Sequence, residues 1–122
     1  MVRQKTAIIE GCNSRRVADR FLGGGNVLNV IIAAINNRQV LTFTYNGLAR
    51  VVEPHAVGVS TAGNEVLRCF QTSGGHIIAG HEWDFCKLSD IRGLAANGHV
   101  FVGERPGYRR GDRNMTKIYA QL

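Results

Sequence analysis

Hydrophobic and polar positions divide the chain into one stretch of helical spacing followed by several stretches of alternating spacing. Between residues 26 and 37, apolar side chains recur at intervals of three and four, and Asn26 is placed to cap the first turn. This pattern predicts an amphipathic helix. The preceding residues, 1–25, are weakly patterned and end in three glycines that predict a flexible break. They are expected to form a separate N-terminal segment or an extra strand.

Beyond the helix the pattern changes to period two, which is typical of strands. Residues 40–45 alternate and are followed by Asn46-Gly47, a pair that favours a type I′ hairpin because both residues tolerate positive φ. The return strand is expected from Leu48, bent or placed at a sheet edge by Pro54. Further predicted elements are strands over residues 65–72, 82–88 and 91–95, a turn at Asn97-Gly98, and one or two helical turns over residues 115–122.

Short strands at regular spacing after one helix predict a mostly β (α+β) fold, either a small barrel or a strongly twisted sheet. The chain has 122 residues, of which 44% are apolar, so it is expected to form one domain with a modest core. We expect this domain over residues 26–103, followed by a basic C-terminal arm and short helix over residues 104–122.

The net charge of +6 is concentrated at the two ends of the chain. Residues 1–25 and residues 104–122 each carry five basic and two acidic groups, which gives +3 apiece, and the middle is neutral. If the ends share one face, they form a patch suited to phosphates; if they point apart, they only aid solubility. The longest apolar run, residues 30–35, is far short of the ~18 residues of a membrane span. With no signal-peptide pattern either, a cytoplasmic location is expected.

Metal binding and catalysis find little support in the pattern. The cysteines Cys12, Cys69 and Cys86 form an odd set without a C-x-x-C pair, which indicates buried thiols in a reducing compartment. His76, His81 and Cys86 do not match the close ligand pairs of structural zinc sites. Ser60, Ser73 and Ser89 lack a recognisable nucleophile elbow. We therefore expect no cofactor, no metal and no enzyme activity.

Residues 28–95 resemble the WYL domain family, bacterial Sm-like or SH3-like β-barrels. The most specific likeness is the Y-x-G-x-x-R-x-V-x-P stretch from Tyr45 to Pro54, supported by residues 31–35, 63–70 and 83–94. The resemblance implies an Sm-like or SH3-like small β-barrel preceded by one helix. Glu65-Val66-Leu67 stands where the family has its eponymous tripeptide, and Asp84 and Asp90 stand where the family often has arginines. These exchanges predict a weaker phosphate site at the last strand.

The resemblance also implies ligand sensing through a basic, aromatic surface that binds nucleic acid or a nucleotide-like ligand. Matched by position, the ligand-binding candidates are Tyr45, Arg50, His55 and Arg68. Packing roles compete with each assignment: Tyr45 and Arg50 can form a cross-strand pair, and His55 can cap a carbonyl. Arg68 is expected to point outward from a strand whose neighbouring side chains face the core.

The C-terminal arm interleaves cations with one aromatic ring. This composition suits a nucleic-acid contact through Arg105, Tyr108, Arg109, Arg110 and Arg113, and equally suits a solvated arm docked on the domain by Tyr108. The sequence thus predicts a regulatory binding module for a negatively charged ligand, such as a nucleotide or single-stranded nucleic acid, that acts on a protein partner. The alternative is an interaction domain without a small ligand that assembles as a homo-oligomer through exposed strand edges.

Overall fold

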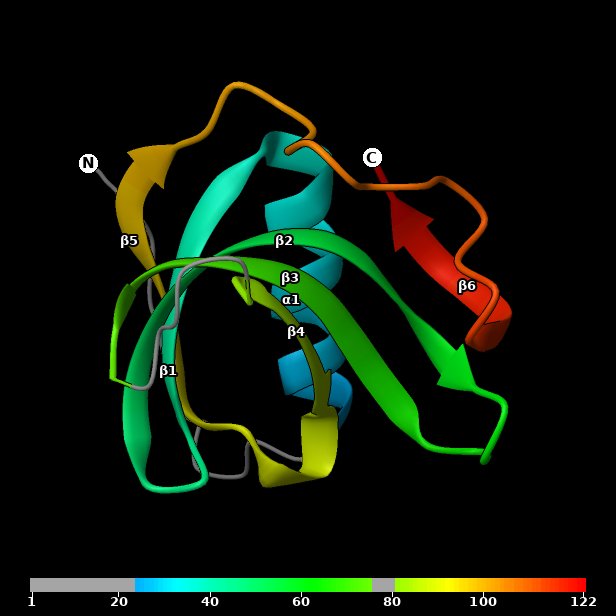
Figure 1. The fold of residues 1–122 in the computed structure, drawn as a ribbon. Coiled ribbons are helices and arrows are strands. Elements are labelled where there is room, and N and C mark those ends of the chain that lie inside the picture. Colours follow the sequence, from blue (N-terminus) through cyan, green and yellow to red (C-terminus); the bar gives the residue numbers. More distant parts are fainter. Residues whose placement is uncertain (1–23, 76–80) are drawn as a thin grey trace.

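The computed structural model describes residues 24–75 and 81–122 and shows a mostly β chain with one helix. A six-stranded antiparallel sheet has the order β4-β3-β2-β1-β5, and β6 pairs with β2 beside this path. Figure 1 shows α1 crossing one face of the sheet. In chain order the elements are α1 (Gly24–Asn37), β1 (Gln39–Tyr45), β2 (Leu48–Ser60), β3 (Glu65–Gly74), β4 (Trp83–Lys87), the short 3-10 helix η4 (Leu88–Asp90), β5 (Arg92–Val100) and β6 (Met115–Gln121).

The helix α1 confirms the predicted amphipathic segment. Its residues Ile31, Ala34 and Ile35 are buried against the sheet and join the main core. The helix starts at Gly24, so the predicted glycine break is wrong at Gly24 and Gly25. Packing of an apolar helix face outweighs the roughly 1 kcal/mol helical cost of a glycine. The remainder of the predicted segment 1–25, residues 1–23, lies outside the described residues.

The Asn46-Gly47 hairpin is confirmed. Asn46 and Gly47 have φ values of 52° and 78°, as a type I′ turn requires, and Tyr45 pairs with Leu48. The returning strand β2 changes partner along its length: it pairs with β1 as far as Val52 and with β6 from Ala56 onward. Pro54 lies in the gap between these two partners, where its missing N–H removes no ladder bond on that side. The predicted bend at Pro54 coincides with a register shift between Pro54 and Ala56.

Two predicted features of the C-terminal third are wrong. Residues 115–121 form strand β6 instead of helical turns, because the exposed edge of β2 offers backbone partners and Thr116, Ile118 and Tyr119 favour a strand. Asn97-Gly98 does not separate two strands but lies inside β5. There, two steps along β1 from Gln39 to Leu41 correspond to four steps along β5, which is a bulge.

The core lies between α1 and the facing side of the sheet, and it includes Leu41, Phe43, Val52 and Leu67. The predicted Sm-like or SH3-like barrel is not confirmed. The strands β4 and β5 are the two ends of the sheet path, and no pairing joins them among residues 24–75 and 81–122, so the sheet is open in this part of the chain. Within the same residues, no helix is long and apolar enough to cross a membrane.

Candidate functional site

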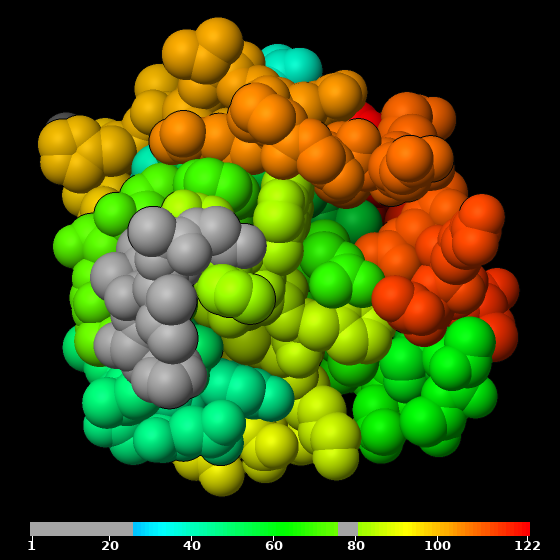
Figure 2. Space-filling view, in the orientation of Figure 1, coloured from blue at the N-terminus to red at the C-terminus, as the bar shows by residue number. Residues whose placement is uncertain are grey.

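The loop between β5 and β6 is the basic arm expected from the sequence, and the structure docks it on the sheet. Arg105 donates two hydrogen bonds to the carboxylate of Glu53, at 2.7 and 3.0 Å, and its guanidinium lies 4.7 Å from the centre of the Phe70 ring. Toward the other end of the loop, Asp112 accepts two hydrogen bonds from Arg68, at 2.8 and 3.4 Å. In Figure 2 this loop, in orange, lies on the surface beside the yellow-green start of β4.

His55 lies behind this loop and is fully buried. Its Nε2 accepts a hydrogen bond from the backbone N–H of Arg105 at 3.1 Å, so the proton of the neutral ring belongs on Nδ1, which donates to the Glu53 carbonyl at 2.9 Å. The rings of Trp83, Tyr108 and Phe101 surround it, with centroid distances of 4.8, 5.0 and 5.8 Å. His55 therefore supports the loop from its buried side through the Arg105 N–H. It also caps the Glu53 carbonyl, which is the packing role that competed with ligand binding for this residue.

Burial lowers the pKa of His55 below its ordinary value of about 6.5, although the Glu53 carbonyl and the Glu53 and Glu104 carboxylates oppose this shift. Below pH 6.5 the unfolded chain therefore takes up a proton at this residue that the folded chain does not. The free energy of unfolding should fall as the pH drops from about 6.5 to the lower pKa of the folded state, and this contribution should then level off.

Urea unfolding at a series of pH values measures this effect. We expect His55→Gln to remove this part of the pH dependence and His99→Gln, at an exposed position on β5, to keep it. Equal pH profiles for the natural chain and His55→Gln would show that His55 is not the responsible group.

Tyr45 and Arg50 form a second, internal cluster. The Arg50 side chain is buried, pairs with Asp84 at 3.2 Å and donates to the Tyr45 carbonyl at 3.3 Å. Its guanidinium also lies 5.3 Å from the centre of the Tyr45 ring, whose hydroxyl accepts a hydrogen bond from the Lys87 N–H. Tyr45 and Arg50 thus pack against each other across the hairpin, which is the packing role that competed with ligand binding for these two residues. Asp84, which stands where the WYL resemblance often has an arginine, is the partner of Arg50.

Arg68 points away from the main core, as expected, but its guanidinium forms an ion pair with the carboxylate of Asp112. Besides the two bonds to Asp112, its guanidinium lies 4.1 Å from the centre of the Phe85 ring. Burial alone would raise the pKa of Asp112, but hydrogen bonds from Arg68 and from the Asn114 N–H hold it below its ordinary value. Asp112 is therefore ionised at neutral pH, and its negative charge offsets the positive charge of Arg68.

One surface pocket of about 640 Å³ opens where the loop meets the start of β4. Three of its arginines, Arg109, Arg110 and Arg113, are exposed, and none of them takes part in an ion pair between described residues. Arg110 donates through Nε to the main-chain oxygen of Leu122 at 2.9 Å. The complete lining is Arg68, Trp83, Gly107, Tyr108, Arg109, Arg110, Gly111, Asp112, Arg113 and Asn114.

Five of the nine candidate residues thus come together at this pocket: Arg68, Tyr108, Arg109, Arg110 and Arg113. The other four lie elsewhere. Tyr45 and Arg50 pack near Asp84, His55 is buried beneath the loop, and Arg105 turns to Glu53. Sequence reasoning missed Trp83 as a site residue, although the lone tryptophan at the start of a predicted strand was a usable signal. It had no signal for Asp112, whose role depends on a partner 44 positions away.

Comparisons with known proteins add no relative: no protein-family model, no curated protein and no solved structure matches this chain. The WYL resemblance of residues 28–95 therefore stays a prediction from the sequence.

Proposed function

We propose that this chain is a WYL-like regulatory binding module, of the Sm-like type, that holds a negatively charged ligand in the pocket at the loop of residues 105–114. The ligand class is a nucleotide or single-stranded nucleic acid, and the bound state modulates a protein partner. The observation that carries the proposal is the gathering of Arg109, Arg110 and Arg113 around one pocket that also presents the rings of Trp83 and Tyr108.

The charge balance of the pocket favours an anion. Arg68 and Asp112 neutralise each other across a 2.8 Å contact, so the three exposed arginines give the lining an excess of three positive charges. Guanidinium groups can bind phosphate oxygens through two parallel hydrogen bonds. Such contacts supply most of the affinity of sequence-independent nucleic-acid binding and make it dependent on salt.

The aromatic rings explain why we favour a base-bearing ligand over a simple anion. Trp83 and Tyr108 are both half-buried and lie nearly parallel, with an interplanar angle of 23° and 6.2 Å between centroids. An aromatic surface beside a row of cations suits a nucleotide, because the base can stack while the phosphate meets the arginines. The His55 ring, which these aromatic rings surround, has no accessible surface and serves only as support.

Binding is tested with labelled single-stranded DNA and RNA by fluorescence anisotropy, and with mononucleotides by the emission of Trp83, the only tryptophan in the chain. The combined variant Arg109→Gln/Arg110→Gln/Arg113→Gln should bind single strands at least about tenfold more weakly at low salt. The slope of log K against log salt should also become shallower by about 2, because each lost phosphate contact removes about 0.7.

The matched control removes three exposed cations elsewhere: Arg38→Gln/Lys87→Gln/Arg92→Gln has the same net charge and leaves the pocket lining intact. It should bind nearly as well as the natural chain. If both triple variants lost the same affinity, the effect would come from overall charge and not from the pocket. If the natural chain bound no single strand at low salt, nucleic acid would be excluded as the ligand. Binding of mononucleotides alone would narrow the ligand class to nucleotides.

The alternative of self-association also has a specific observation in its favour. Strand β5 is an edge of the sheet and is exposed along nearly its whole length, and beside its end Val100 and Val102 are 72% and 101% exposed. An exposed edge with apolar side chains can pair with a second copy of the chain. Light scattering over a concentration series tests self-association. A strict monomer at high concentration would exclude self-association as the function and leave ligand binding as the proposal.

A further inference from the structure

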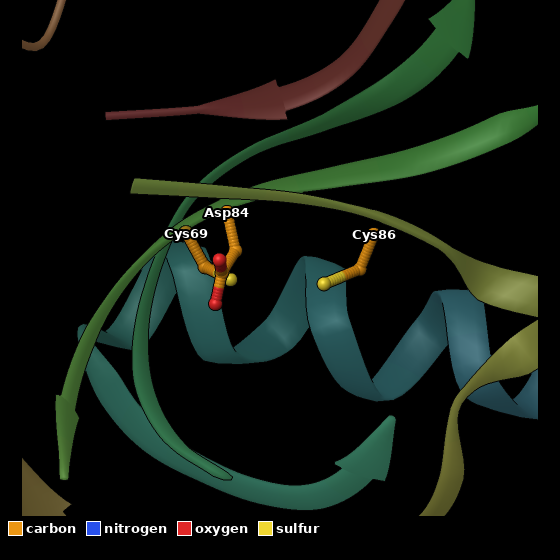
Figure 3. Close-up of side chains that lie close together, drawn as sticks. All are labelled: Cys69, Asp84 and Cys86. Atoms are coloured by element: carbon orange, nitrogen blue, oxygen red, sulfur yellow. The ribbon is translucent and has the colours of Figure 1, made fainter. Parts of the chain in front are cut away.

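Strands β3 and β4 bring two cysteines and an aspartate together at a place separate from the basic pocket. The sulfur atoms of Cys69 and Cys86 and a carboxylate oxygen of Asp84 all lie within 4.8 Å of one another. Figure 3 shows the two thiols pointing toward each other from neighbouring strands, and the Asp84 carboxylate overlaps the Cys69 side chain in this view. The register explains the meeting: Cys69 lies opposite Asp84, and Cys86 is two residues further along β4, so all three side chains share one face.

We propose that Cys69, Asp84 and Cys86 form a binding site for one thiophilic divalent cation, with Zn²⁺ as the best fit. Two thiolates and one carboxylate belong to the ligand types that zinc takes in tetrahedral sites, and water can supply the fourth position. With Zn–S bonds of about 2.3 Å, tetrahedral geometry separates the two sulfurs by about 3.8 Å. Ligand atoms that already lie within 4.8 Å need to move by only about 1 Å to reach that spacing.

Arg50 makes the charge of such a site acceptable in a buried place. Two thiolates and a carboxylate carry three negative charges, and a divalent cation leaves one of them uncompensated. The Arg50 guanidinium, 3.2 Å from one oxygen of Asp84, supplies the missing positive charge, so the whole cluster is neutral. A carboxylate has two oxygens, so Asp84 can keep this ion pair through one and bind the metal through the other.

The Nε–H group of Arg50 gives a second, independent indication. Among the described residues, Arg50 Nε is a buried side-chain nitrogen without a hydrogen-bond partner. An unsatisfied buried donor costs about 1–3 kcal/mol, more when the group is charged, and calls for an acceptor. A metal-bound water or thiolate would supply an acceptor beside the same guanidinium, whose Nη1 lies 3.2 Å from Asp84. The outer-shell hydrogen bond that results would hold the ligands in position, as it does in known metal sites.

A disulfide is the competing use of two neighbouring thiols, and the register speaks against it. Cys69 and Cys86 are diagonal neighbours across the β3–β4 pair, for which Cα atoms are typically about 7–8 Å apart. Disulfides usually require about 4.4–6.8 Å. A metal ion can bridge this longer diagonal, because the two Zn–S bonds together place about 4.6 Å of bond length between the sulfurs. Entry is possible from the side of Asp84, whose side chain is 20% exposed, whereas both cysteines are buried.

The test uses the full chain, reduced and stripped with a chelator, and titrated with Co²⁺ as a spectroscopic probe. We expect one equivalent to bind, with thiolate-to-cobalt charge-transfer absorption and the intense visible bands of tetrahedral cobalt, and Zn²⁺ to displace it. This measurement needs no variant. Absence of the charge-transfer absorption would overturn the proposal, and a Cys69–Cys86 disulfide formed with mild peroxide in a chain that binds no metal would assign the pair to redox chemistry instead.

Variants then locate the site. Cys69→Ala and Cys86→Ala should each abolish the charge-transfer absorption or weaken Zn²⁺ binding at least about 100-fold, and Asp84→Asn should weaken it about tenfold. Cys12→Ala is the matched control, since Cys12 is the third cysteine of the chain and is not among the proposed ligands. Excess Zn²⁺ should also raise the unfolding temperature of the natural chain and of Cys12→Ala, but not of the other two cysteine variants. Loss of binding in Cys12→Ala would contradict the assigned ligand set.

Discussion

His55→Ala should lower the free energy of unfolding by about 3–4 kcal/mol. The change removes a fully buried ring that packs against three aromatic side chains, and it leaves a cavity that the rigid sheet cannot close. It also takes the acceptor from the Arg105 N–H, a hydrogen bond of 3.1 Å behind the loop. Urea unfolding, followed by the emission of Trp83, measures the loss because Trp83 lies 4.8 Å from the replaced ring.

His99→Ala provides the control for this prediction. His99 is exposed on β5, and its replacement should change the free energy of unfolding by less than about 0.5 kcal/mol. Because the loop rests on His55, His55→Ala should also weaken ligand binding at the pocket even under conditions where the chain stays folded. A His55→Ala chain as stable as the natural one would mean that the aromatic cluster does not support the loop.

Gly58→Ala should detach β6 from β2 or cost about 3 kcal/mol of stability. A Cβ at Gly58 would overlap the carbonyl oxygen of Lys117 and lie 2.9 Å from the Cα of Ile118. Both atoms belong to the backbone of β6, which pairs with β2 at this position, so no side-chain rotation relieves the overlap. Amide hydrogen exchange should show faster exchange along β6 while the β1–β2 hairpin keeps its protection.

The matched control is Gly103→Ala. At Gly103 the nearest atom to an added Cβ is the Arg38 Nε, at 4.0 Å, and stability should hardly change. If Gly58→Ala retained the exchange protection of β6, the close backbone approach between β2 and β6 would be refuted.

The parts of the fold that follow from short sequence patterns were predictable. The helix was signalled by apolar spacing around Ile31 and Ile35, and the first hairpin by Asn46-Gly47, because both depend on residues close together in the chain. Strand β6 was not, since residues 115–121 become a strand through pairing with β2, more than 50 positions away. For the same reason Asn97-Gly98, a good turn pair, is absorbed into a bulge of β5.

The site divides along the same line. Composition alone indicated that the arm of residues 105–113 carries the cations, and the pocket draws most of its lining from it. Which cations stay available depended on distant carboxylates: Glu53 engages Arg105, Asp84 engages Arg50, and Asp112 engages Arg68. The Cys69, Asp84 and Cys86 cluster was equally out of reach, because its spacing resembles no metal motif until β3 and β4 pair.

The two ion pairs that hold the loop, Arg105–Glu53 and Arg68–Asp112, differ in how exposed their arginines are to solvent. The side chains of Arg105 and Glu53 are 42% and 9% exposed, whereas those of Arg68 and Asp112 are 22% and 8% exposed, so the difference lies in the arginines. Dissolved ions screen exposed charges more than shielded ones, so rising ionic strength should weaken the Arg105–Glu53 ion pair before the Arg68–Asp112 pair, while the Arg105 N–H stays bonded to the buried His55. The slope of a salt titration of ligand binding would then contain two effects, the weakening of this ion pair within the loop and the release of counterions from the ligand. The number of phosphate contacts calculated from the slope alone would therefore be too high.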